Sequence, residues 1–190
     1  MKQITGVRYH LRRGDSAQIH KLLHSGSVRL GFVGAMLEPD SMTYFPMLED
    51  HLVMCTANNP HYQALKKQNV YGRDLLREPT VAREEGSGTD RTVQSYMRNM
   101  GLADQDLHIV ARVDDPEAIK RMTAQGVGVS VLSALSVASE VNDGRLLTFP
   151  MDPQGLHRSI YLVYPRETIL SQSEQAFVRF CRQMAIRRNL

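Results

Sequence analysis

The segment with the clearest potential for chemistry is residues 83–90, REEGSGTD, where a short apolar strand leads through a glycine-rich turn into a helix. Such a turn directs backbone N–H groups outward at the helix N-terminus, and the hydroxyls of Ser87 and Thr89 add donors. The pattern suits a carboxylate, sulfate or phosphate group. The same residue types also form an ordinary capped helix start, so both interpretations stay open here.

The charges around this turn do not favour one ligand. Arg83 and Arg91 would attract an anion, whereas Glu84, Glu85 and Asp90 would repel it. The sign of the field depends on which face each side chain occupies.

Two further strand-to-helix turns carry hydroxyl or carboxylate side chains. They are residues 14–16 (GDS) and residues 131–133 (VLS). In open α/β sheets ligands gather at the carboxyl ends of the strands, so the turns could converge on one cleft. Each turn on its own is equally typical of a helix cap, because Ser and Asp are favoured N-cap residues.

No catalytic constellation is present in the sequence. There is no Gly-x-Ser-x-Gly elbow and no Walker loop, and residues 126–128 (GVG) lack the third glycine of a dinucleotide fingerprint. His20 and His24 are four residues apart, as metal ligands can be, but no third ligand accompanies them, and we expect two surface histidines. We therefore predict no catalytic residues, no metal and no cofactor.

Composition and charge indicate an ordinary globular protein. The 190 residues are 42% hydrophobic, and the formal net charge is only +3, which is weak evidence for nucleic-acid binding. No apolar run approaches a membrane span, and the N-terminus lacks a signal-peptide pattern. We expect a cytoplasmic protein in which Cys55 and Cys181 are buried, reduced thiols.

Predicted strands and helices alternate along the chain, which indicates α/β architecture with largely parallel sheets. Helices are expected to begin near Asp15 or Ser16, after the turn at 84–89, at residues 115–117 (DPE) and at Ser133, and the last helix spans 171–184. The predicted strands are residues 7–12, 28–34, 45–48, 51–56, 80–83, 107–113, 127–132, 145–148 and 159–164.

The order of these segments resembles the effector-binding domain of LysR-type transcriptional regulators. The most specific pieces are the GSGT turn at 86–89 and EAIKRMTAQGVGVSVLS at 117–133, and the similarity covers nearly the whole chain. The resemblance implies a two-lobed type 2 periplasmic-binding-protein fold with mixed, mainly parallel sheets and a hinge. Lobe I would hold residues 1–54 plus 162–190, and lobe II residues 55–161, with crossing strands near 51–56 and 159–164.

The resemblance also implies a small-molecule effector, a carboxylate or an inorganic anion, bound between the lobes to control transcription. It implies a homodimer formed through the effector domain, and the lack of a long apolar run separately predicts no membrane partner. The family's cleft positions map onto Ser16, Gly34, Arg83, Glu84, Ser87, Gly88, Thr89, Val131 and Ser133.

Two departures from the family accompany this match. The helix-turn-helix domain is absent from this sequence, so contact with DNA is expected only through such an N-terminal domain. The family's sensor domain also begins with a further strand and helix, roughly 30 residues, the size of one supersecondary unit. That strand would lie between the strands matched by residues 7–12 and 28–34, so its absence would leave backbone groups unpaired.

Two other functions fit the same fold. A solute-binding protein would carry an export signal, which residues 1–13 lack. An enzyme, such as a dehydratase acting on a small carboxylate, would need a positioned acid or base, for which Glu84 is the candidate. We expect a sensor domain and not an enzyme.

Overall fold

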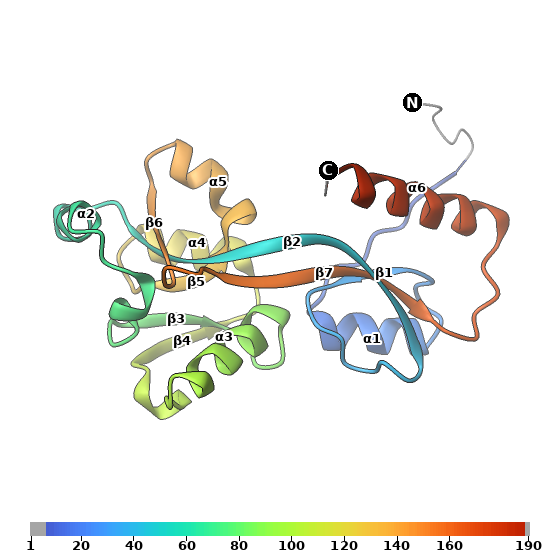
Figure 1. Cartoon of the computed structure of the whole chain (residues 1–190), viewed down its shortest axis with the longest axis horizontal. Helices are drawn as coiled ribbons and strands as arrows, with labels where there is room; N and C mark the ends of the chain where they lie inside the picture. Colours follow the sequence, from blue (N-terminus) through green and yellow to red (C-terminus); the bar gives the residue numbers. More distant parts are fainter. Residues whose placement is uncertain (1–6, 189–190) are drawn as a thin grey trace. The chain divides into compact units, whose positions relative to one another are not determined.

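The computed structural model describes residues 7–188, and the chain divides into two compact units (Figure 1). Among these residues, unit 1 holds those up to Leu48 and from Ser159 onward, and unit 2 holds Glu49–Arg158. Strands β2 (Met42–Ala57) and β7 (Leu156–Pro165) contribute residues to both units. The lobe boundaries expected from the sequence stay a prediction.

Unit 1 contains one short strand, parts of β2 and β7, and two helices. Helix α1 (Ser16–His24) begins at a capping box, in which the Asp15 carboxylate accepts a hydrogen bond from the Gln18 N–H at 2.7 Å and the Gln18 side chain accepts one from the Asp15 N–H. Strand β1 (Gly31–Val33) pairs antiparallel with β7. Gly31 permits close packing on α1, because a Cβ there would lie 2.6 Å from the Ile19 side chain. Helix α6 (Gln172–Arg188) completes the unit.

The strand predicted for residues 7–12 is wrong. These residues have no regular secondary structure, and most of their side chains are exposed, with Leu11 at 92%. A strand requires a hydrogen-bonded neighbour for its amides and carbonyls. Within residues 7–188, β1 pairs with β7, and no strand lies beside residues 7–12.

Unit 2 contains a sheet and a separate strand pair. Strands β5 (Ser130–Ser133) and β6 (Leu146–Pro150) both pair antiparallel with β2. Strand β3 (Thr80–Arg83) lies parallel beside β4 (Ile109–Val113), and Thr80 forms a parallel bridge with Val129 (Figure 1). The mixed α/β class predicted from the sequence is confirmed. Parallel pairing is found around β3, whereas β2 and β7 pair antiparallel with the neighbours described above.

The remaining elements of unit 2 cover these strands. Buried side chains such as Met54, Phe149 and Met151 form one core cluster, and Val81, Ile119 and Leu132 belong to another. The covering elements are α2 (Pro60–Lys67), η1 (Gly72–Leu75), α3 (Gly88–Asn99), η2 (Asp104–Asp106), α4 (Pro116–Ala124) and α5 (Ala134–Asn142).

Several predicted elements are found with altered bounds. The extended segments 45–48 and 51–56 belong to the single strand β2, and the strand predicted at 127–132 begins only at Ser130. Gly128 permits two backbone segments to approach closely. A Cβ there would lie 2.4 Å from the Pro79 carbonyl oxygen, just before β3.

Both cysteines are buried and free, as predicted. Burial raises the pKa of the Cys55 thiol to about 12 and also raises the pKa of Cys181. The thiolate is the reactive form, so burial lowers the reactivity of both side chains.

Helices α4 and α5 are joined by a buried ion pair. The Lys120 ammonium lies 3.0 Å from the Glu140 carboxylate and 2.8 Å from that of Glu117, and it donates to the Ser136 carbonyl. Burial raises the pKa of Glu140, but hydrogen bonding and the charge of Lys120 outweigh it, so the net shift is downward. The pair is therefore formed and charged at neutral pH.

We expect this pair to make the free energy of unfolding depend on pH. Because the folded-state pKa of Glu140 is lowered, its stabilisation is present above the ordinary carboxyl pKa and is lost as the pH falls through the folded value. Lys120→Met should destabilise the protein by about 3–5 kcal/mol near neutral pH, since a buried carboxylate loses its main partner. Urea unfolding measures both effects.

Matched variants show how much of the stability lost at low pH is due to this ion pair and how much to the rest of the protein. The Lys120→Met/Glu140→Leu double variant should lose less stability than the unsubstituted chain on acidification. Ser139→Ala, on the exposed side of α5, should behave like the unsubstituted chain. An identical pH dependence in the double variant would contradict this role for Glu140.

Candidate functional site

The turn between β3 and α3 has the geometry of a capped helix start. Ser87 is the N-cap of α3, and its hydroxyl accepts a hydrogen bond from the Asp90 N–H at 3.1 Å. Gly86 has a φ of +83°, in the region that favours glycine. A hydroxyl that accepts can still donate one hydrogen bond, and the amides of Gly88 and Thr89 have no acceptor within the helix. The cap and an anion site are therefore compatible.

The charged residues of this turn are largely neutralised by one another. Arg83 forms a two-point ion pair with Glu84, both contacts at 2.6 Å. The Asp90 carboxylate accepts from the Gly86 N–H at 3.1 Å and lies 3.3 Å from the Arg112 guanidinium. The Arg91 side chain donates to the Gly86 carbonyl. Because these charges are paired, neither sign dominates the electrostatic field at the turn.

A second group of polar side chains connects two of the predicted turns. Asp50 of β2 is 2% exposed, and its carboxylate accepts from the Ser133 hydroxyl at 2.6 Å and from Arg158 Nε at 2.9 Å. Arg158 of β7 also donates from Nη1 to the Thr89 hydroxyl at 2.9 Å. We call these four residues, all in unit 2, the Asp50–Arg158 network.

This network brings the N-termini of two helices together. Ser133 is the N-cap of α5, and Thr89 lies in the first turn of α3. The positive ends of both helix dipoles and a guanidinium group therefore lie close to one another, with one carboxylate balancing the guanidinium. Such an arrangement can bind a small anion through backbone amides and hydroxyls.

A small hollow adjoins the turn in unit 2. It includes Val131, which was predicted from the family resemblance, together with Arg83 and Thr89. The hollow is mainly apolar, and the charged residues Asp90 and Arg112 also line it. The other lining residues are Met54, Leu76, Thr80, Ala82, Val93, Gln94, Leu107 and Ile109.

The predicted site residues fall in both units. Arg83, Glu84, Ser87, Gly88, Thr89, Val131 and Ser133 belong to unit 2, whereas Ser16 and Gly34 belong to unit 1. Ser16 is the first residue of α1 and is 5% exposed, and Gly34 follows β1. The binding role of all nine stays a prediction.

Sequence reasoning missed Asp50 and Arg158. A signal for Asp50 was available, because strand alternation places it on the same face as Leu48 and Leu52, where a carboxylate needs a partner. Nothing local identifies that partner, because Arg158 lies 108 residues further along the chain.

The expectation of two surface histidines on α1 is wrong for His20. His20 is 2% exposed, and its ring nitrogens lie 2.6 Å from the Ser16 carbonyl oxygen and 2.5 Å from the Tyr44 hydroxyl. These two partners satisfy the ring, which permits its burial. His24 is exposed and contacts Glu38. Among the residues whose positions are described, the histidine and carboxylate group that could hold a metal is Glu49, His51 and His157.

Comparison with known proteins shows the family. The LysR substrate binding domain family matches residues 1–185, and the chain belongs to this family. No helix within residues 7–188 is long and apolar enough to cross a membrane.

Among the individual relatives, one is named as a transcriptional activator and another carries the name of a transport protein. The chain is 26% identical to the HTH-type transcriptional activator CmpR of Synechocystis sp. over 94% of its length, and it spans 57% of that protein. It is 28% identical to a protein named phosphonates import ATP-binding protein PhnC of Anaeromyxobacter dehalogenans over 93% of its length, and spans 35% of that relative. The regulatory domain of Synechocystis PCC6803 CcmR, solved in complex with 2-PG, superposes with a TM-score of 0.81 at 25% identity, covering 95% of this chain and 84% of the other.

We expect Asp50 and Arg158 to be energetically coupled. Removing one partner leaves the other charge buried, so Asp50→Asn and Arg158→Met should each destabilise unit 2, and the double variant should be less destabilised than the sum of the two. A coupling energy of about 1–3 kcal/mol is expected from urea unfolding of the four proteins.

The pair formed by Arg73 and Asp74 is the matched control. Its atoms are 3.9 Å apart and both side chains are about half exposed. The corresponding cycle, Arg73→Met with Asp74→Asn, should give a coupling below about 0.5 kcal/mol. Equal coupling in both cycles would show that the buried network has no special role.

Proposed function

We propose that this chain is the ligand-sensing domain of a transcription regulator and that it binds a small carboxylate or oxyanion at the N-termini of α3 and α5. The observation that carries the proposal is the Asp50–Arg158 network, which holds Thr89 and Ser133 at adjacent helix N-termini. The amides there are the donors that an anion needs, and the helix dipoles favour negative charge. The complex of CcmR with 2-PG supports a small ligand for this domain.

The proposal places control of transcription in a longer protein. CmpR is named as a transcriptional activator, and this chain spans 57% of its length. In this account ligand binding biases the conformation of the domain, and other parts of the regulator contact DNA. A homodimer formed through this domain and a cytoplasmic location are retained as predictions.

The proposed role includes no catalytic step. Glu84 is the candidate general base, but its carboxylate is held in the two-point ion pair with Arg83. A carboxylate paired in this way is poorly placed to take a proton from a bound substrate. This observation favours a sensor over an enzyme of the same fold.

Thermal unfolding with a ligand panel tests the proposal. Sulfate, inorganic phosphate, 2-PG and small organic carboxylates would each be titrated against the chain. A ligand that binds the folded form should raise the melting temperature in a saturable manner, with about 2.7 kcal/mol of stabilisation at a hundredfold excess over its Kd.

Substitutions then locate the binding site. The Ser87→Ala/Thr89→Ala double variant should abolish the shift, because it removes two hydroxyls at the start of α3. Ser95→Ala, at an exposed position on the same helix, should leave the shift unchanged. The proposal fails if no compound gives a saturable shift, or if the double variant responds like the unsubstituted chain.

A further inference from the structure

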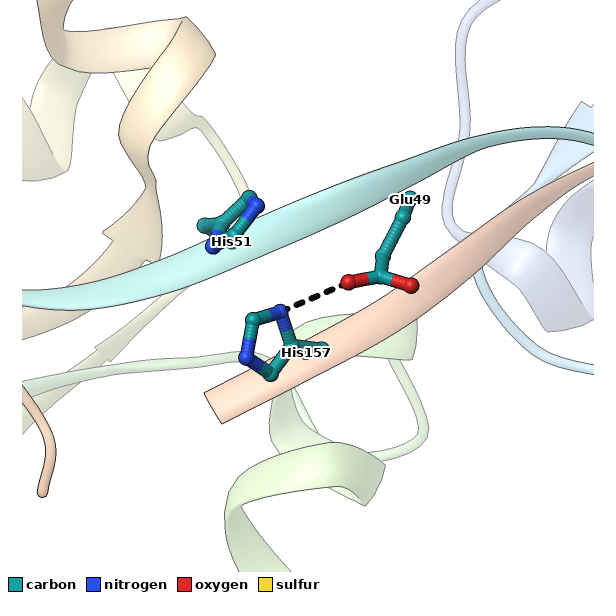
Figure 2. Close-up of side chains that lie close together, drawn as sticks. All are labelled: Glu49, His51 and His157. Atoms are coloured by element: carbon teal, nitrogen blue, oxygen red, sulfur yellow. Dashed lines mark ion pairs between the residues drawn. The ribbon is translucent and has the colours of Figure 1, made fainter. Parts of the chain in front are cut away.

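Three exposed side chains gather on neighbouring strands of unit 2. Figure 2 shows Glu49 and His51, from β2, beside His157, from β7. One potential metal-ligand atom from each residue lies within 4.8 Å of the other two. Glu49 Oε1 lies 2.9 Å from His157 Nδ1, and the two imidazole rings meet edge to face at 4.4 Å. We call these residues the Glu49–His157 cluster.

Strand alternation explains why these side chains share one face. Glu49 and His51 are exposed, whereas Asp50 and Leu52 between and after them are buried. On β7, His157 is exposed, and the next residue, Arg158, turns to the Asp50 carboxylate. Because successive side chains of a strand point to opposite faces, the cluster lies on the reverse face of the strands that carry the Asp50–Arg158 network.

The contacts of His157 leave Nδ1 facing a carboxylate. Nε2 of this ring lies 2.9 Å from the Gln154 carbonyl oxygen, which can only accept, so Nε2 carries the hydrogen. Nδ1 is therefore the ring atom that faces the Glu49 carboxylate oxygen, at 2.9 Å. An imidazole nitrogen and a carboxylate oxygen placed side by side are two ligand atoms that one metal cation can share.

The contact of His157 Nε2 with the Gln154 carbonyl is of the kind that orients metal-binding histidines. A ligating imidazole commonly donates its other N–H to a backbone carbonyl, which fixes the tautomer and the ring orientation. The turn before His157 is shaped for this contact. Gly155 has a φ of +77°, and a Cβ at that position would lie 2.7 Å from His157 Nε2.

We propose that Glu49, His51 and His157 bind a divalent transition metal ion, with Zn²⁺ as the best fit. Two imidazole nitrogens and one carboxylate oxygen form a common three-residue zinc set, with water in the fourth position. Zinc bonds of about 2.0–2.2 Å place tetrahedral ligand atoms about 3.3–3.6 Å apart. The exposed side chains reach this spacing by rotamer adjustment from their present separations.

The ligand atoms of the cluster also determine which metal ions it prefers. Mg²⁺ and Ca²⁺ prefer oxygen ligands, and the cluster supplies one carboxylate against two imidazoles. A Zn²⁺ ion bound by Glu49, His51 and His157 would add a further connection between β2 and β7, which are already neighbours in the sheet. This site is independent of the anion site proposed above, because it uses different residues on the other face of the two strands.

Zinc titration of the chain tests this inference. The protein, free of any histidine tag and stripped with chelator, would be titrated with Zn²⁺ by calorimetry and by thermal unfolding. We expect one Zn²⁺ per chain, a higher melting temperature, and no comparable effect of Mg²⁺. Substitution of Co²⁺ should produce the visible absorption bands of a tetrahedral site.

The variants assign the binding to these residues. His51→Ala and His157→Ala should each weaken Zn²⁺ binding by more than about tenfold, and Glu49→Gln should also weaken it. His61→Ala, which removes an exposed histidine beside Glu78, is the matched control and should not weaken it. Melting temperatures in chelator show whether each variant is folded, and Glu49→Gln preserves the shape of the cluster. The inference is overturned if no saturable binding is seen, or if Zn²⁺ binds the two histidine variants as tightly as the unsubstituted chain.

Discussion

The buried pair of Asp50 and Arg158 is the constraint on which the site in unit 2 depends. The Asp50 side chain is 3% exposed and that of Arg158 15%, so both charges need partners within the protein. The partners available are the hydroxyls of Ser133 and Thr89, at the starts of α5 and α3. The hydrogen bonds of Asp50 and Arg158 therefore hold β2 and β7 against the N-termini of α5 and α3. This arrangement places the first amides of both helices where they can bind an anion.

The two strands that carry this pair present different chemistry on their two faces. Asp50 is buried and the Arg158 side chain is only 15% exposed, while Glu49, His51 and His157 are exposed. The alternation of a strand allows both sets to occupy consecutive positions without competing. One segment of β2 and one of β7 can therefore serve a buried polar network and a surface cluster of metal-binding side chains.

Local chemistry in the sequence predicted the local structure well. The helix starts near Asp15, Ser87, Asp115 and Ser133 were predictable because a cap depends on a few consecutive residues. The connection of Ser133 and Thr89 through Asp50 and Arg158 was not, because it is made between residues far apart in the chain.

The two wrong predictions also depended on contacts between residues that are far apart in the sequence. Residues 7–12 have a strand-like composition, but a strand exists only where another pairs with it. His20 was expected on the surface because the sequence does not show that Tyr44 lies within hydrogen-bonding distance of its ring. In both cases tertiary contacts decided the outcome.

The measurement that tests the central claim most directly is an amide chemical-shift titration of the ¹⁵N-labelled chain with 2-PG or inorganic phosphate. The account predicts that the largest changes occur at the first amides of α3, Gly88 and Thr89, and of α5, Ala134 and Leu135. Saturable changes that leave these four amides unaffected, or no changes at all, would contradict it.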